Sequence, residues 1–271
     1  MPKTPTALYL HGGPGLNCAV ERAWFGESCP VLWWDQPRFP ADADNAYQAT
    51  LDAAAEQLAE LRTRQVEPVN IIGWSFGARL ALDLAQRAPE AIGALTLLAP
   101  SLCLETAFER MTGYLAAKGA CTPAPLLSAP RSDCRTGNHE GFMLRVMSIL
   151  SIPDLLSHYW APTSGALSAR HGMETARTHW FDLDTFSAVS REIIKHPIAS
   201  LPPGQVKRIR IFAGRYDPYF DPEVDVDLWK TLFPEASVRI DDSGHMLPLE
   251  IPVAEWLASP LPAPAESHPE P

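Results

Sequence analysis

The chain has 271 residues, 46% of them apolar and 20% charged, which is a globular composition that can supply a sizeable core. Its length fits one large α/β domain, with or without an insertion, better than two equal domains. The formal net charge is −10, so Coulomb repulsion disfavours a nucleic-acid partner. No stretch approaches the roughly 20 apolar residues of a membrane span, and the first apolar run is too short for a signal peptide. We therefore expect a cytoplasmic protein without a membrane partner.

Short apolar runs of strand length alternate with helical patterns along the chain. This alternation is typical of a mostly parallel sheet that is covered by helices on both faces. Six strands are predicted, at residues 6–10, 31–34, 69–72, 94–98, 208–213 and 237–240. Four helices are predicted, at residues 47–64, 76–88, 222–233 and 248–258.

The pattern changes between the fourth and fifth predicted strands. Residues 101–207 contain helical stretches but no convincing strand, which predicts a helical cap inserted into a core of residues 1–100 and 208–258. The insertion holds 10 Lys and Arg against 9 Asp and Glu, so the acidic surplus belongs to the core. Residues 259–271 are rich in proline and lack apolar periodicity, so we expect a disordered tail.

The cysteines give no sign of a disulfide framework or a metal site. Their number is odd and none forms a C-x-x-C pair; they are Cys18, Cys29, Cys103, Cys121 and Cys134. The histidines of residues 101–207 have no metal-ligand spacing, and no phosphate loop or dinucleotide fingerprint is present. We expect reduced thiols, no metal and no organic cofactor.

The strongest motif is Gly73-Trp74-Ser75-Phe76-Gly77, which stands between a predicted strand and a predicted helix. A G-x-S-x-G in this context is a nucleophile elbow, where the flanking glycines permit a tight turn that exposes the serine hydroxyl. The helix start beyond it favours negative charge, and the free amide of Phe76 can stabilise an oxyanion. Ser75 is therefore the predicted nucleophile.

A serine hydroxyl needs a base and a carboxylate that orients the base. Asp217 follows the fifth predicted strand and His245 follows the sixth, so both leave the carboxyl edge of the sheet, where ligand sites form. The chain order Ser75, Asp217, His245 differs from the orders of the chymotrypsin and subtilisin types and is that of α/β-hydrolases.

The first predicted strand ends in His11-Gly12-Gly13-Pro14-Gly15. A glycine-rich turn lets a backbone amide approach a substrate closely, and Gly13 is the candidate for the second oxyanion donor beside Phe76. Gly12, Trp24 and Trp74 are the candidate residues of the substrate pocket.

With these motifs the chain resembles the α/β-hydrolase fold superfamily, and its HGGPG turn and GWSFG elbow resemble those of the prolyl iminopeptidase branch. The resemblance implies a triad of Ser75, Asp217 and His245, and oxyanion donors at Gly13 and Phe76. It also implies a six-stranded sheet, because the leading hairpin of many family members is missing here.

Two features leave the substrate class open. Prolyl iminopeptidases typically carry Asp-Gln-Arg-Gly where this chain has Asp35-Gln36-Pro37-Arg38. In that family, cap carboxylates hold the substrate ammonium, and the insertion has no acidic surplus, although it offers Glu140, Glu174, Asp182 and Asp184.

We predict a serine hydrolase that cleaves a small amide, short peptide or ester through an acyl-enzyme on Ser75. The leading interpretation is a prolyl iminopeptidase-like activity, and the alternative is a carboxylesterase or lactonase acting on a small neutral substrate. A thioesterase of an assembly line is a third interpretation, and a non-hydrolytic lyase or binder on the same fold is more distant. The expected partner is a small molecule or a short peptide, and the oligomeric state stays open.

Overall fold

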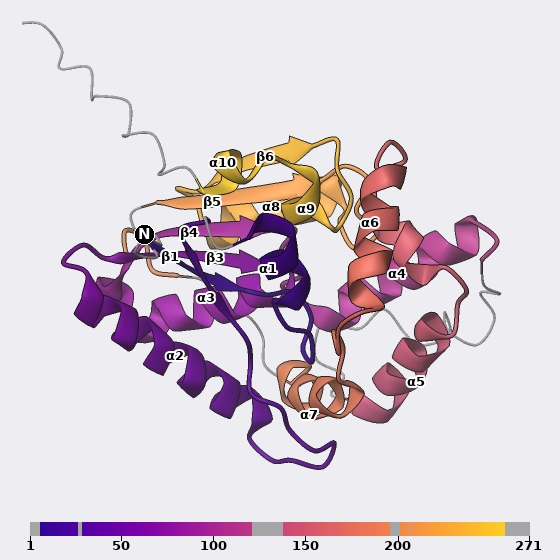
Figure 1. Cartoon of the computed structure of the whole chain (residues 1–271), viewed down its shortest axis with the longest axis horizontal. Helices are drawn as coiled ribbons and strands as arrows, with labels where there is room; N and C mark the ends of the chain where they lie inside the picture. The colour runs from indigo at the N-terminus through magenta and orange to yellow at the C-terminus, as the bar shows by residue number, and fades with distance from the viewer. Residues whose placement is uncertain (1–5, 27–28, 121–137, 196–200, 207, 258–271) are drawn as a thin grey trace, which may run out of the picture.

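The computed structural model describes residues 6–26, 29–120, 138–195, 201–206 and 208–257. Its strands form one all-parallel sheet of six in the order β2-β1-β3-β4-β5-β6 (Figure 1). They are β1 (Ala7–Leu10), β2 (Val31–Trp34), β3 (Val69–Trp74), β4 (Ile92–Leu98), β5 (Ile209–Gly214) and β6 (Ser237–Asp241). Every predicted strand is present, with its ends within two residues of the expected ones.

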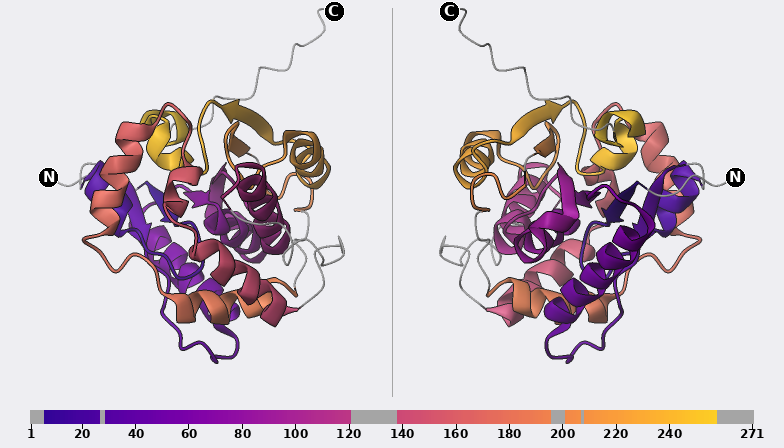
Figure 2. Two further views of the ribbon diagram at one scale, coloured as in Figure 1. Left: turned by 90° about the vertical axis from the view of Figure 1, so that its right-hand side faces the viewer. Right: turned by 90° about the vertical axis from the view of Figure 1, so that its left-hand side faces the viewer.

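Alternate residues of the strands pack into two separate apolar cores, because successive side chains of a strand point to opposite faces of the sheet. In β1, Leu8 and Leu10 belong to one apolar cluster, whereas Ala7 and Tyr9 belong to the other. The first cluster includes side chains of α2 (Ala46–Arg64), α3 (Phe76–Arg87) and α8 (Pro222–Leu232). The second includes α1 (Ala19–Phe25), α9 (Leu247–Glu250) and α10 (Val253–Leu257), so helices cover both faces (Figure 2).

The predicted helix at residues 248–258 is wrong as a single element. The structure has the two short helices α9 and α10 instead, separated at Ile251 and Pro252. Ile251 is extended, with φ −102° and ψ 150°, because the ring of the following proline disfavours a helical conformation at the preceding residue. The chain turns there, and Trp256 of α10 becomes fully buried in the second core.

The described part of residues 101–207 is helical and contains no strand. It comprises α4 (Leu104–Ala117), α5 (His139–Leu150), the 3-10 helix η2 (Leu155–Tyr159), α6 (Gly165–Thr175) and α7 (Leu183–Ile193). These helices lie beyond the carboxyl ends of the strands (Figure 1). The division into a core domain and a cap domain stays a prediction, and the expected tail at 259–271 lies outside the described residues.

Two further expectations concern covalent and membrane features. Among the described residues, no disulfide joins any two of Cys18, Cys29 and Cys103, whereas Cys121 and Cys134 lie outside the described residues. Within the described ranges, no helix combines the length and the apolar character that a membrane crossing requires.

Close packing of α3 on the sheet depends on the glycines of the serine motif. A Cβ atom at Gly77 would lie 2.1 Å from the carbonyl oxygen of Leu10, and one at Gly73 would lie 2.3 Å from the carbonyl oxygen of Gly77. Both separations are far shorter than a van der Waals contact. The atoms met are backbone atoms, which cannot move aside as the end of a side chain can. A side chain at either position would therefore push α3 away from β1 and β3.

We expect Gly77→Ala to lower the free energy of unfolding by about 1–3 kcal/mol, the usual cost of overpacking. The matched control is Gly113→Ala in α4, where a Cβ would meet no atom within 4 Å. That variant should gain up to about 1 kcal/mol from helix propensity. Urea unfolding of both variants measures the difference, and equal stabilities would contradict the packing argument.

Candidate active site

Ser75 occupies the sharp turn between β3 and α3. Its φ of 52° and ψ of −111° lie in a region that non-glycine residues rarely adopt, which is the strained geometry of a nucleophile elbow. The turn is held by hydrogen bonds from the Ser75 N–H to the Leu98 carbonyl (2.8 Å) and from the Ala78 N–H to the Ser75 carbonyl (3.1 Å). Since β1 and β3 are paired with Leu10 opposite Gly73, Ser75 and the turn after β1 emerge at the same sheet edge.

Three side chains from the ends of β3, β5 and β6 form one hydrogen-bonded chain. The His245 Nε2 lies 2.9 Å from the Ser75 Oγ, and the His245 Nδ1 lies 2.8 Å from the Asp217 Oδ2. The Asp217 carboxylate accepts only if Nδ1 carries the proton, which leaves Nε2 free to accept the Ser75 proton. All three side chains are buried. The structure thus brings together the predicted nucleophile, the predicted base and the carboxylate predicted to orient the base.

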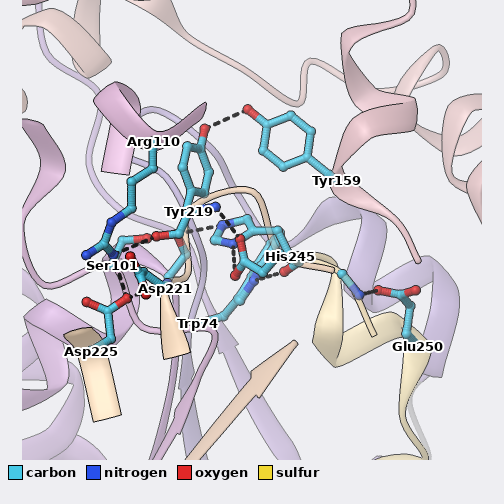
Figure 3. A network of polar contacts seen from close by, with 12 residues as sticks. Trp74, Ser101, Arg110, Tyr159, Tyr219, Asp221, Asp225, His245 and Glu250 are labelled. Carbon is cyan, nitrogen blue, oxygen red and sulfur yellow. Dashed lines mark hydrogen bonds and ion pairs between the residues drawn. The ribbon is translucent and has the colours of Figure 1, made fainter. Parts of the chain in front are cut away.

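The loop that carries His245 is fixed on several sides (Figure 3). The Trp74 indole Nε1 donates to the His245 carbonyl at 2.9 Å, which ties the loop to the serine motif. Glu250 accepts from the Gly244 N–H at 2.6 Å with one oxygen and from the Ala161 N–H at 2.9 Å with the other. Sequence reasoning missed Glu250, because nothing in its neighbourhood indicates a partner 89 residues away.

The turn after β1 presents the candidate oxyanion donors. Gly13 has a φ of +56°, a conformation that favours glycine, and Phe76 is the first residue of α3, so its N–H has no acceptor within the helix. His11 supports this turn from below: its Nε2 accepts from the Gln36 N–H at 3.2 Å, and its Nδ1–H donates to the Gly12 carbonyl at 2.8 Å. Burial lowers the pKa of His11, so the ring stays neutral as this pattern requires.

A cavity of about 730 Å³ opens above Ser75 and His245. Gly12, Gly13, Trp74 and Phe76 line its floor. Its walls come mainly from apolar side chains of the helical segment, namely Leu104, Ala107, Phe108, Val146, Ile149, Leu150, Leu155, Leu156, Trp180, Phe181 and Phe186. Asp154 and Ser157 also border it, but both are solvent-exposed and so mark its mouth.

Trp24 does not line this cavity, so its placement in the substrate pocket requires correction. The Arg170 guanidinium lies 3.9 Å from the centre of a Trp24 ring, and Trp160 packs against the same side chain at 6.5 Å. Trp24 belongs to α1, which covers the second core. Through its contact with Arg170, it packs α1 against α6. Trp24 is therefore close to the HGGPG turn in the sequence but does not line the cavity that this turn borders.

Comparison with known proteins decides the family. Residues 8–252 match the family model of the alpha/beta hydrolase fold. The chain belongs to the α/β-hydrolase family. The predicted fold class is therefore confirmed, including the six-stranded parallel sheet flanked by helices.

The sequence relatives of this α/β hydrolase include a lipase and an esterase. It is 27% identical over 203 residues to Lipase LipV of Mycobacterium tuberculosis, which covers 73% of this chain and 70% of the relative. It is 33% identical over 144 residues to the pimeloyl-[acyl-carrier protein] methyl ester esterase of Neisseria meningitidis serogroup C, covering 49% and 50%. The chain is therefore a hydrolase with esterase- and lipase-like relatives.

Solved structures agree on the fold of this α/β hydrolase. A proline iminopeptidase-related protein from Thermus thermophilus has a TM-score of 0.66 at 18% identity, covering 95% of this chain and 88% of that one. A thermophilic esterase from Thermogutta terrifontis has a TM-score of 0.60 at 16% identity, covering 94% and 88%. At these identities the likeness concerns the fold and leaves the substrate class open.

In this α/β hydrolase, none of the four carboxylates considered for ammonium binding lines the cavity. Asp182 caps α7 by accepting from the Thr185 N–H at 2.7 Å, and it pairs with Arg38 at 3.4 Å. Glu140 and Asp184 are exposed, and Glu174 is half-buried on α6. Of the cavity residues in the described part of the chain, only Asp154 at the mouth is acidic.

Proposed function

We propose that this α/β hydrolase is a serine carboxylesterase whose substrates are neutral esters with an apolar acyl group. The observation that carries the proposal is the Ser75–His245–Asp217 hydrogen-bonded chain at the floor of a largely apolar cavity. Cavities of about this size hold most of a drug-sized ligand. The esterase and lipase relatives support the same class of reaction.

The reaction proceeds by acyl transfer in two halves. The Ser75 Oγ attacks the ester carbonyl carbon while the His245 Nε2 takes its proton, and the amides of Gly13 and Phe76 stabilise the oxyanion. Collapse breaks the bond to the alcohol, whose oxygen receives the proton from His245. Water then attacks the acyl-enzyme with His245 again as the base, which releases the carboxylic acid and restores Ser75. Asp217 orients His245 and stabilises its positive charge.

The cavity favours this esterase over the iminopeptidase interpretation. A prolyl substrate brings a free ammonium, and moving an ammonium out of water costs several kcal/mol unless a carboxylate is paired with it. The walls above Ser75 are largely apolar. Among the described cavity residues, the one acidic side chain that could pair with an ammonium is Asp154, and it is exposed at the mouth. A neutral acyl group avoids this cost and gains from burial.

The test compares two esters that share a leaving group, p-nitrophenyl hexanoate and p-nitrophenyl 6-aminohexanoate. We expect kcat/KM to be at least about 100-fold higher for the hexanoate, because only the second ester carries an ammonium into the cavity. Proline p-nitroanilide should not be turned over above the rate of a Ser75→Ala control. Equal rates on the two esters, or turnover of the anilide that Ser75→Ala abolishes, would favour the iminopeptidase instead.

A further inference from the structure

Two phenol hydroxyls meet inside the apolar cavity. Tyr159 belongs to η2 of the helical segment and Tyr219 belongs to the loop after β5, and both line the cavity. Their hydroxyl oxygens are 2.7 Å apart and point toward one another above His245 (Figure 3). Nothing in the catalytic roles of Ser75, His245 and Asp217 requires this pair.

Both tyrosines are held in place through their backbones. The Tyr219 N–H donates to the Asp217 Oδ1 at 2.8 Å, and its carbonyl accepts from Arg110 of α4 at 3.0 Å. The Tyr159 carbonyl accepts from the Met246 N–H at 3.1 Å. A pair fixed by two separate segments keeps its orientation without a ligand, which is the condition for a preorganised binding site.

The pair borders His245 directly. The Tyr219 ring lies edge-on to the His245 ring with centres 4.6 Å apart, and the Tyr159 ring lies 5.7 Å from it. His245 delivers its proton to the leaving oxygen, so the alcohol part of an ester must sit beside its Nε2. Side chains that flank His245 in the cavity therefore border the alcohol part of the substrate.

One of the two hydroxyl protons of the pair is not used in the hydrogen bond between the tyrosines. Burial raises the pKa of Tyr159 to about 12 and raises that of Tyr219 as well, so both phenols stay protonated at neutral pH. Two hydroxyls carry two protons, and one of these lies between the two oxygens. In the part of the chain that the structure describes, the other proton has no hydrogen-bond acceptor. Both side chains are half-buried and line the cavity, so this donor can be taken up by an acceptor of a bound ligand.

The other polar side chains of the cavity are placed differently. Ser101 lies 3.4 Å from the Ser75 Oγ and so belongs to the nucleophile, whereas Asp154 and Ser157 are exposed at the mouth. Ser168 is a half-buried lining residue on α6. Tyr159 and Tyr219 are the hydroxyl-bearing side chains of the described cavity lining whose rings contact His245.

We propose that the Tyr159–Tyr219 hydroxyl pair binds a hydrogen-bond acceptor, an ether or carbonyl oxygen, on the alcohol part of the ester substrate. The proposal rests on the proposed function and narrows it to esters whose alcohol part is polar while the acyl part is apolar.

The test uses butyl hexanoate and 2-methoxyethyl hexanoate, which differ in one CH₂ replaced by an ether oxygen. After correction for the hydroxide-catalysed rates, we expect the wild type to prefer the methoxyethyl ester about fivefold in kcat/KM, the effect of one neutral hydrogen bond. The double variant Tyr159→Phe/Tyr219→Phe should lose this preference. Because the preference compares two esters in one protein, a general loss of activity cancels.

Two controls make the result specific. Tyr114→Phe removes a hydroxyl from α4, outside the cavity lining, and should keep the preference. Moving the ether oxygen to the acyl part, in butyl 3-ethoxypropanoate, should bring no gain over butyl hexanoate. A gain there that the double variant removes would overturn the assignment to the alcohol part.

The failure of the two proposals can be told apart. If the wild type hydrolyses both hexanoate esters equally well, the esterase proposal stands and the tyrosine site is wrong. A preference that survives in the double variant also overturns the site. If neither ester is hydrolysed, the proposed function fails and the inference falls with it.

Discussion

Replacing Ser75 by alanine is expected to lower kcat on p-nitrophenyl hexanoate by about a millionfold, the scale on which removal of a triad serine acts. The hydroxyl lies 2.9 Å from the His245 Nε2, and without it the base has no nucleophile to activate. Some acceleration over water should remain, because the amides of Gly13 and Phe76 and the cavity walls are untouched. Steady-state hydrolysis measures the loss.

The control for this variant is Ser148→Ala, which removes an exposed hydroxyl from α5 outside the cavity lining and should keep full activity. Urea unfolding checks that both variants retain the fold. A fluorophosphonate should add covalently to wild-type Ser75, as mass spectrometry of the labelled peptide would show. Labelling of another residue, or turnover that survives in Ser75→Ala, would contradict the assigned nucleophile.

Asp217→Asn is expected to lower kcat by about ten thousandfold with little change in KM, as loss of the orienting carboxylate does in such triads. One oxygen of Asp217 accepts from the Tyr219 N–H and the other from the His245 Nδ1. In the variant, the amide oxygen should stay on the Tyr219 N–H, which turns the NH₂ group toward His245. The histidine then holds its proton on Nε2 and cannot accept the proton of Ser75.

The matched control is Asp227→Asn, which removes the same charge from an exposed position of α8, outside the cavity lining, and should leave kcat unchanged. NMR supplies a second readout, since the downfield Nδ1 proton of His245 should be present in the wild type and absent from Asp217→Asn. A kcat within tenfold of wild type would show that Asp217 does not orient the base.

Local features of the sequence were enough to predict the strands and the positions of the triad residues. Apolar runs separated by helical patterns predicted all six strands, because a strand that is buried on both faces must be apolar throughout. The serine motif predicted its own turn, since glycine is needed where α3 approaches β1 and β3 within contact distance. The ends of parallel strands share one edge, so the positions of Asp217 and His245 after β5 and β6 were enough to predict that they approach Ser75.

Short elements escaped this kind of prediction. α1 has only seven residues, too few for apolar periodicity to indicate a helix. The break between α9 and α10 depends on Pro252, which disfavours a helical conformation at Ile251 within an otherwise helical pattern.

Only the tertiary structure decided what surrounds the catalytic groups. Tyr159 meets Tyr219 across 60 residues of sequence, and Glu250 reaches Ala161 across 89. Trp24 follows the HGGPG turn in sequence yet packs under Arg170, away from the cavity. Sequence patterns report the periodicity and turns of neighbouring residues, whereas these contacts depend on how the helical segment sits over the sheet edge. The sequence therefore predicted acyl transfer through Ser75 and left the substrate class open, whereas the packing of α4 to α7 decided the shape and polarity of the cavity from which we propose an ester substrate.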